Sequence, residues 1–238
     1  MSALRSEQQI APSELFFSAA TQGTDLGARF TTGDGRVYRY VQGTNTAFVA
    51  GKLYQTIPQD TTNFQSLGVS VAAGTLTTAV TTGSSVTLFA NECAGGLLTV
   101  RSGSGAGFGY KIKSHPSVTT GTLTFQLEDP LQVGLLATSV IDVTPSPYTG
   151  VVVQATTATA IPIGVAVNNT TGSNFGWVQT RGICNVLCAG TAAVATNVSA
   201  STTVAGAVQS STGSQPIVGY MMVTGVNAVN LPVFLTIE

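Results

Sequence analysis

The side chains best suited to chemistry in this sequence are three cysteines and a single histidine. Cys184 and Cys188 form a C-x3-C motif, Cys93 lies far from both, and His115 precedes Pro116. Thiolates and an imidazole can hold a zinc ion or form a Cys–His nucleophile. A zinc site needs four ligands, or three and a water, and these residues show no paired spacing of the zinc-ribbon kind. We therefore expect no metal site and no cofactor.

The C-x3-C motif lies in a segment, 174–188 (NFGWVQTRGICNVLC), whose residues are typical of a β-strand. On a strand, Cys184 and Cys188 point to the same face, with Cα atoms about 13 Å apart at about 3.3 Å per residue. A disulfide requires Cα atoms within about 7 Å of each other, so these two thiols cannot bond unless the chain folds back. We predict that the cysteines are small apolar residues packed in a β core.

The other candidate catalytic groups are typical of turns. His115 stands at a predicted strand end, where a turn histidine is expected. Glu128 and Asp129 would face opposite sides of a strand, and the Asp-Pro step that follows is a turn signal. The glycine-rich segment 103–109 (GSGAGFG) has neither the G-x-G-x-x-G pattern before a helix nor a Walker lysine. We predict that the protein is not an enzyme and has no catalytic residue.

The elements around these residues are short strands separated by turns. Val, Thr and aromatic residues alternate with segments rich in Gly, Pro and Asn, and no window shows a helical apolar period. Strands are expected at 36–41, 46–55, 85–90, 97–101, 109–113, 122–127, 161–167, 177–187, 202–208, 216–223 and 231–237. The fold class predicted is all-β, a sandwich or barrel with an extended N-terminal arm.

The distribution of charge suggests how the chain is divided. The segment around Pro145 and Pro147 has the composition of a boundary, and after it Arg181 is the only charged residue before Glu238. We predict an N-terminal arm at 1–25, a β domain at 26–145 and a low-charge β domain at 146–238. The last two form either one continuous β fold or two small subdomains.

The composition of the chain indicates which classes of partner it can bind. Only 8% of the 238 residues are charged and the net charge is −1, whereas an ordinary soluble domain is about 25% charged. A surface so poor in charge is weakly protected against association, so we expect a homo-oligomer, and a homotrimer in particular. The absence of a basic stripe argues against nucleic-acid binding, and the absence of about 20 consecutive apolar residues argues against a membrane span. Without a signal-peptide pattern, the chain is expected in the cytoplasm where it is made.

Two features are candidate assembly contacts. Leu15, Phe16 and Phe17 are consecutive apolar residues in an arm without core patterning, and we expect them to pack on a neighbouring subunit or another protein. Arg181 must be either solvated or paired, because burying an unpaired guanidinium costs several kcal/mol. We predict that Arg181 is paired, with an acid such as Asp142, Glu128 or Asp129 or with one from another subunit.

A series of motifs also resembles a known family. GDGRVYRYVQG, AGKLYQ, GYKIKSHP, LTFQLEDPL, SPYTGVV, IPIGVAV, FGWVQTRG and QPIVGYMM follow one another from about residue 27. In this order they resemble the capsid decoration (cement, or head-stabilising) proteins of tailed bacteriophages. The resemblance implies a β-rich, usually trimeric virion protein on the capsid exterior, bound to the major capsid protein and bridging neighbouring capsomers. The cysteines belong to none of these motifs.

Two other functions remain open. A tail or fibre subunit of a virion is one alternative, although a fibre should show repeats of about 20–50 residues and none is found. A carbohydrate-binding β-sandwich is the other. It would favour exposed aromatic residues on loops, whereas Trp177 falls inside a predicted strand.

Overall fold

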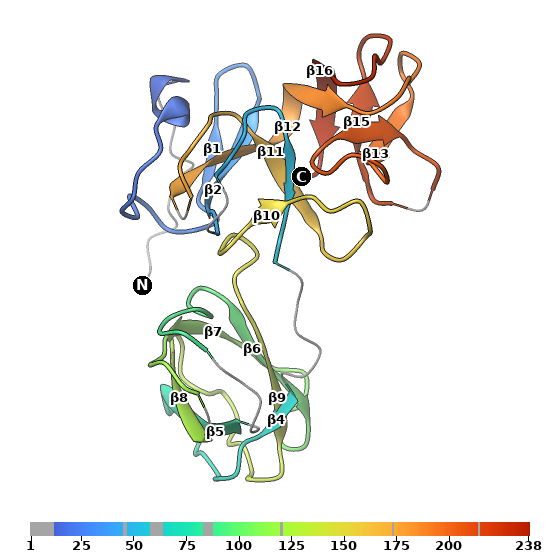
Figure 1. The fold of residues 1–238 in the computed structure, drawn as a ribbon. Helices are drawn as coiled ribbons and strands as arrows, with labels where there is room; N and C mark the ends of the chain where they lie inside the picture. The colour runs from blue at the N-terminus through green and yellow to red at the C-terminus, as the bar shows by residue number, and fades with distance from the viewer. Residues whose placement is uncertain are drawn as a thin grey trace. The chain divides into compact units, whose positions relative to one another are not determined.

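The computed structural model describes residues 12–44, 47–57, 64–82, 88–119, 121–172, 174–213 and 215–238. Within these ranges it contains sixteen β-strands and one 3-10 helix, η1 (Pro12–Phe16), so the predicted all-β class is confirmed (Figure 1). The expected strand at 202–208 is largely a turn, and strands lie on either side of it, at Asn197–Ala200 and Val208–Ser210. At 85–90, residues 88–90 are not a strand and 85–87 lie outside the described residues.

The chain forms two compact units. Unit 1 comprises Met1–Pro58 and Pro147–Glu238, and unit 2 is the intervening segment Gln59–Ser146. The boundary expected near Pro145 therefore lies beside the observed one. The predicted β domain at 26–145 is corrected, because strands between residues 29 and 55 pair with strands after residue 150.

Unit 1 is built around one long strand, β12 (Phe175–Cys188). The other strands of the unit are β1 (Arg29–Thr31), β2 (Val37–Gln42), β3 (Leu53–Gln55), β10 (Val152–Val153), β11 (Pro162–Ala166), β13 (Asn197–Ala200), β14 (Val208–Ser210), β15 (Ile217–Met221) and β16 (Val229–Thr236). The N-terminal half of β12 pairs with β2 and β11, and its C-terminal half pairs with β16. This single strand thus links two differently built parts of the unit.

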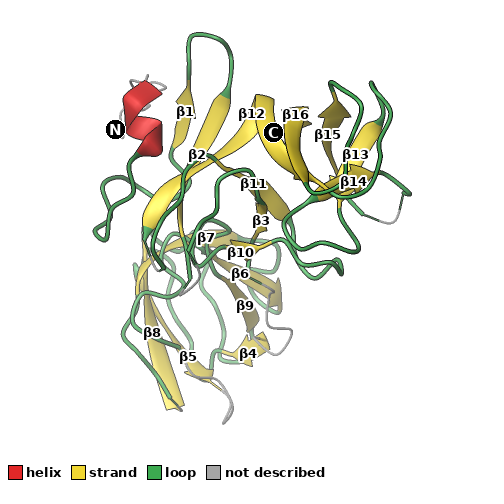
Figure 2. Cartoon of the chain, turned by 45° about the horizontal axis from the view of Figure 1, so that its top comes forward, coloured by secondary structure: helices red, strands yellow, loops and turns green. Residues whose placement is uncertain are grey.

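The C-terminal half of β12 belongs to a closed five-stranded barrel. The strand order is β12–β14–β13–β15–β16, and β16 pairs back onto β12, which closes the ring (Figure 2). The barrel interior is filled by small and medium apolar side chains: Cys184, Val186, Cys188, Ala192, Val198, Ala200, Val208, Val218, Met221, Val233 and Leu235. Five strands enclose little space, which explains why Val, Ala and Cys dominate this core.

The N-terminal half of β12 is covered on both faces. Its residues 175–180 are all buried, whereas 181–188 alternate between exposed or half-buried and buried. On one face an aromatic cluster packs together: Phe30, Tyr38, Tyr40, Phe175 and Trp177, with Leu15 from η1. A second cluster contains Val41, Phe48, Tyr54, Val151, Ile163, Ala166 and Val178.

The position of Leu15 corrects part of the predicted arm. Its side chain is buried in the aromatic cluster of its own unit, because η1 packs against β12. Leu15 is therefore a core residue and not an assembly contact. Residues 1–11 of the predicted arm lie outside the described residues.

Unit 2 is a six-stranded antiparallel sheet with its own core. The order is β4 (Phe64–Ser66), β9 (Val140–Thr144), β6 (Leu97–Ser102), β7 (Gly109–Ser114), β8 (Gly121–Leu127) and β5 (Thr77–Thr82). Along β6, β7 and β9 buried residues alternate with more exposed ones, as expected for a sheet with one covered face. The buried face includes Leu98, Val100, Ile112, Phe125 and Ile141.

Candidate assembly surface

The cysteines occupy the structural positions that the sequence predicted. Cys184 and Cys188 lie on β12 and contribute to the barrel core, and Cys93 belongs to the core of unit 2. All three are free and buried. Burial raises the pKa of the Cys93 and Cys184 thiols to about 12 and also raises the pKa of Cys188. A reactive thiol has a lowered pKa, so these thiols are inert.

His115 is a buried connecting residue at the end of β7. Its Nε2 accepts a hydrogen bond from the Cys93 backbone N–H at 2.9 Å, and Nδ1 lies 2.8 Å from the Pro116 carbonyl oxygen. These partners assign the proton to Nδ1, which donates to the carbonyl. The ring also packs beside Phe125, with centroids 5.2 Å apart. Both ring nitrogens are thus occupied by backbone groups, and the imidazole holds the 91–95 turn against the strand end.

The remaining chemical candidates lie in exposed turns, as predicted. Glu128 follows β8 and forms a surface ion pair with Lys111 at 3.1 Å. Residues 103–108 of the glycine-rich segment connect β6 to β7, and Gly103, Gly105 and Gly107 have positive φ angles. Among the described residues no group of three or more His, Cys, Asp or Glu side chains gathers into a metal-binding arrangement. The described part of the chain also has no helix with the length and hydropathy of a membrane span.

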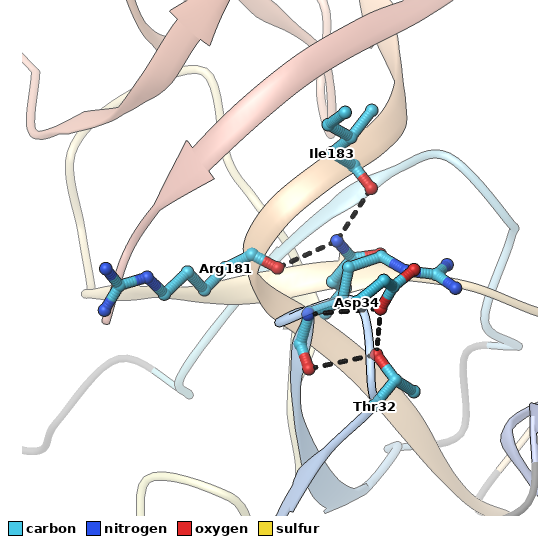
Figure 3. Close-up of polar contacts among 6 residues, drawn as sticks. Thr32, Asp34, Arg181 and Ile183 are labelled. Atoms are coloured by element: carbon cyan, nitrogen blue, oxygen red, sulfur yellow. Dashed lines mark hydrogen bonds and ion pairs between the residues drawn. The ribbon is translucent and has the colours of Figure 1, made fainter.

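Arg181 is exposed on β12, where the strand passes from β2 to β16. Its backbone oxygen accepts a hydrogen bond from Gln179 Nε2 at 2.9 Å, while its side chain extends away from Thr32 and Asp34 (Figure 3). Within the described residues its guanidinium has no ion pair. Asp142, Glu128 and Asp129 belong to unit 2, so their predicted pairing with Arg181 stays a prediction, as does pairing with an acid from another subunit.

Asp34, which lines the same pocket as Arg181, already has its own partners. Its carboxylate accepts hydrogen bonds from the Thr32 hydroxyl and from Arg36 Nε, the latter at 2.7 Å. The Thr32 hydrogen bond lowers the pKa of Asp34 most, and the Arg36 interactions lower it further, against an opposing effect of desolvation. Asp34 is therefore ionised and satisfied within the β1–β2 turn, and it does not neutralise Arg181.

An exposed apolar row crosses the outside of the barrel beside Arg181. Ile183 on β12 lies opposite Phe234 on β16, and Phe234 lies opposite Tyr220 on β15. Their side chains are 52%, 40% and 44% exposed, respectively. Directly opposed residues on neighbouring strands have Cβ atoms about 4.5–5.5 Å apart, so the three side chains form a continuous strip. We call Ile183, Phe234 and Tyr220 the outer apolar row.

The segment that follows β15 carries more exposed apolar residues. The connection from β15 to β16 carries exposed Met222, Val223 and Val226, and Val229 is exposed at the start of β16. No charged residue occurs anywhere in the sequence between Arg181 and Glu238. Neighbouring exposed apolar side chains such as those of the outer apolar row are typical of an interaction site.

Two pockets are lined both by contact residues predicted from the sequence and by residues of the outer apolar row. The first, of about 290 Å³, is lined by Leu15, Phe16 and Cys184 among others. The second, of about 550 Å³, is lined by Asp34, Arg181, Gly182 and Phe234 among others. Arg36 and Ile183 line both pockets. Phe16 and Arg181, two of the predicted contacts, thus lie around one region of unit 1, and Phe17 is 70% exposed next to Phe16.

No family model, curated protein or solved structure matches this chain.

Proposed function

We propose that this protein is a non-enzymatic virion structural protein of a tailed bacteriophage. In this role it binds the outer surface of the capsid and stabilises contacts between subunits of the major capsid protein. It acts as a homotrimer, without a cofactor, nucleic acid or membrane, and is assembled onto the capsid in the host cytoplasm. The observation that carries the proposal is the outer apolar row, exposed on a barrel whose residues 182–237 contain no charged side chain, which suits a protein that functions when packed against other proteins.

The motifs behind the resemblance to decoration proteins support the proposal through their positions. GDGRVYRYVQG contains the β1–β2 turn and β2, FGWVQTRG is the first half of β12, and QPIVGYMM contains β15. All three are in unit 1, the unit that carries the outer apolar row. A trimer would multiply modest contacts with the capsid, so its avidity exceeds the affinity of a single site by orders of magnitude.

Binding to undecorated capsids tests the proposed function. The purified protein is mixed with capsids that lack it and imaged by electron cryomicroscopy. Density at regular positions on the capsid exterior, with capsids more resistant to heating, is the expected result. Capsids that remain bare at micromolar protein would overturn the proposal.

Exposed aromatic residues in unit 2 favour a second candidate, carbohydrate binding. Phe89 is 75% exposed on a loop, and Phe108 is 41% exposed beside Tyr110, with ring centroids 6.3 Å apart. Aromatic faces on loops are what a sugar-binding surface requires, whereas Trp177 is buried in unit 1. A glycan array probed with the wild type and with Phe89→Ala separates the two candidates, since only carbohydrate binding predicts a signal lost in the variant.

A further inference from the structure

The smaller of the two pockets in unit 1 combines apolar and polar side chains. Its volume is about 290 Å³, and its lining comes from η1, β2, β11, β12 and β16 together with the segment before β3. Leu15, Phe16 and Ala166 are part of its apolar lining. Small-molecule sites are concave, largely apolar and carry a few polar groups that orient the ligand, with volumes of about 300–1,000 Å³. This pocket is at the lower end of that range and suits a ligand of one ring.

Gln179 gives the pocket a hydrogen-bond acceptor in a fixed orientation. Its side chain is 2% exposed, and Nε2 donates to the backbone oxygens of Arg181 and Ile183, both at 2.9 Å (Figure 3). Both hydrogens of the amide group are therefore used. Within the described residues no donor is bonded to the other atom of the amide, Oε1. A ligand that donates a hydrogen bond to Oε1 would satisfy the last polar group of a buried side chain.

Tyr38 adds a donor close to this acceptor. Tyr38 on β2 lies directly opposite Gln179 on β12, and both residues line the pocket. Burial raises the pKa of Tyr38 to about 12, so its hydroxyl group keeps its proton and remains able to donate. No hydrogen bond of this hydroxyl group to the rest of the described chain is present. The pocket thus has a donor and an acceptor on neighbouring strands.

Two exposed asparagines, Asn185 and Asn230, line the same pocket. A Cβ atom on Gly51 would lie 2.8 Å from Asn230 Oδ1, so the glycine leaves the space that this carboxamide uses. Neither asparagine side chain is hydrogen-bonded to the described part of the chain. A carboxamide both donates and accepts, which suits a ligand with adjacent hydroxyl groups.

The charge of the pocket favours a neutral ligand. Of the described residues that line it, Arg36 alone is charged. Arg36 Nε lies 2.7 Å from Asp34 Oδ2, and this carboxylate offsets the charge of the guanidinium. The remaining wall includes Phe16, which is 64% exposed and offers a phenyl ring to the apolar side of a ligand.

We propose that this pocket binds a neutral saccharide residue. The hydroxyl groups of one sugar ring supply the adjacent donors and acceptors that Gln179, Tyr38 and the two asparagines bond, and the C–H face of the ring packs on Phe16. The site belongs to unit 1, whereas the exposed Phe89 and Phe108 belong to unit 2. The inference does not depend on the proposed function, because the pocket is formed within one chain.

Saturation-transfer NMR on the full chain tests the proposal. The probes are D-glucose, D-galactose, D-mannose and N-acetyl-D-glucosamine, each at millimolar concentration, and sodium benzoate is the anionic comparison. At least one of the four sugars is expected to receive saturation from the protein, and benzoate is not. Titration of the sugar signal then gives the dissociation constant.

Variants of exposed side chains locate the binding site. Asn230→Ala removes one carboxamide from the pocket and is expected to weaken binding about three- to tenfold, the effect of one net hydrogen bond. Phe16→Ala removes the phenyl ring and is also expected to weaken binding. Asn197→Ala is the matched control, because Asn197 is an exposed asparagine on β13 that does not line the pocket. Its affinity is expected to equal that of the wild type, and circular dichroism checks that each variant is folded.

The outcomes separate this inference from the proposed function. Absence of saturation for all four sugars would overturn the inference, as would a sugar bound equally well by the wild type and Asn230→Ala, since its site would then lie elsewhere. Binding of benzoate without any sugar would identify an anion site at Arg36 and would overturn it too. Sugar binding that weakens in Asn230→Ala supports the inference even where capsids stay bare, in which case the proposed function alone fails.

Discussion

Arg181 is a cation that its own unit leaves without a carboxylate among the described residues. Replacing it with methionine keeps an apolar stem and removes the charge. Because Arg181 is exposed, we expect Arg181→Met to change the free energy of unfolding of the dissociated chain by about 0.5 kcal/mol or less. Its thermal midpoint should therefore change very little. If an acid from another copy or from the capsid receives the guanidinium, assembly weakens measurably.

Sedimentation equilibrium measures the effect of Arg181→Met on self-association, and capsid pelleting measures its effect on binding. Lys113→Met, at an exposed cation on β7, is the control because it makes the same change in net charge. Unchanged self-association, capsid binding and thermal midpoint would show that Arg181 is only a surface residue.

The three thiols give a test of the buried cores. Because the pKa of Cys93 and Cys184 is raised to about 12, almost no thiolate is present at pH 8 in the folded protein. We expect a thiol-specific reagent such as DTNB to label none of the cysteines in the native state and all three after unfolding in guanidinium chloride. Rapid labelling of a native cysteine would contradict the core assignment.

The raised pKa values of the buried thiols also predict a loss of stability at alkaline pH. An unfolded thiol ionises near its ordinary pKa of about 8.5, whereas the folded thiols of Cys93 and Cys184 hold their protons to about 12. Proton loss above pH 9 therefore favours the unfolded chain, and stability falls as the pH rises toward 12. The thermal midpoint is expected to drop between pH 8 and pH 10.5, and to drop less in Cys184→Ala. An equal drop in the variant would remove Cys184 as a cause.

The residues of the candidate surface differ in how far sequence could reveal them. Arg181 and Phe16 were named as candidates because an isolated charge and an apolar cluster are visible in the sequence. Ile183 was missed because ICNVLC is apolar on both strand faces, so alternation cannot say which face is covered. Phe234 was missed for the same reason in LPVFLTI. Only the closure of the barrel decides which of these side chains point inward.

Among the elements, β12 depends on a glycine at its change of partner. Gly182 has a φ of +85°, and a Cβ there would lie 3.0 Å from Arg36 Cγ. Gly190, just beyond the strand, has a φ of +77° but open space around it. We expect Gly182→Ala to destabilise the protein by about 1–3 kcal/mol from backbone strain, with a further loss from the contact.

Chemical denaturation of Gly182→Ala and Gly190→Ala separates the two effects. The Gly190 variant reports the cost of positive φ alone, so the Gly182 variant should be the less stable of the two. Equal stabilities would mean that Arg36 moves aside at no cost.

The helix η1 gives a contrast between neighbouring residues. Leu15→Ala removes a side chain that is 2% exposed in the aromatic cluster, and we expect a loss of about 2–5 kcal/mol. Phe17→Ala alters a side chain that is 70% exposed, and the expected change is within about 0.5 kcal/mol. Urea unfolding compares the two. A harmless Leu15→Ala would restore the prediction that this segment is a free arm.

At the scale of the whole molecule, composition predicted the fold class but not the connectivity. Frequent Val and Thr, with Gly and Pro between short runs, indicate strands because those residues favour pleated and turn geometries. The proline-rich segment near Pro145 indicated a boundary. The pairing of strands after residue 147 with strands before residue 58 was not predictable. No local sequence pattern indicates which distant strand supplies a partner.

The insertion of unit 2 within unit 1 orders the events of synthesis on the ribosome. All the strand pairs of unit 2 lie between residues 64 and 144, so this unit has every partner it needs once Ser146 has emerged. In contrast, Gln42 on β2 must wait for Phe175 on β12, and the barrel cannot close until β16 has been made. Such distant pairings fold slowly. The nascent chain therefore carries a folded unit 2 while the aromatic residues of β2 remain without partners, which makes unit 1 the part of the protein most exposed to aggregation during translation.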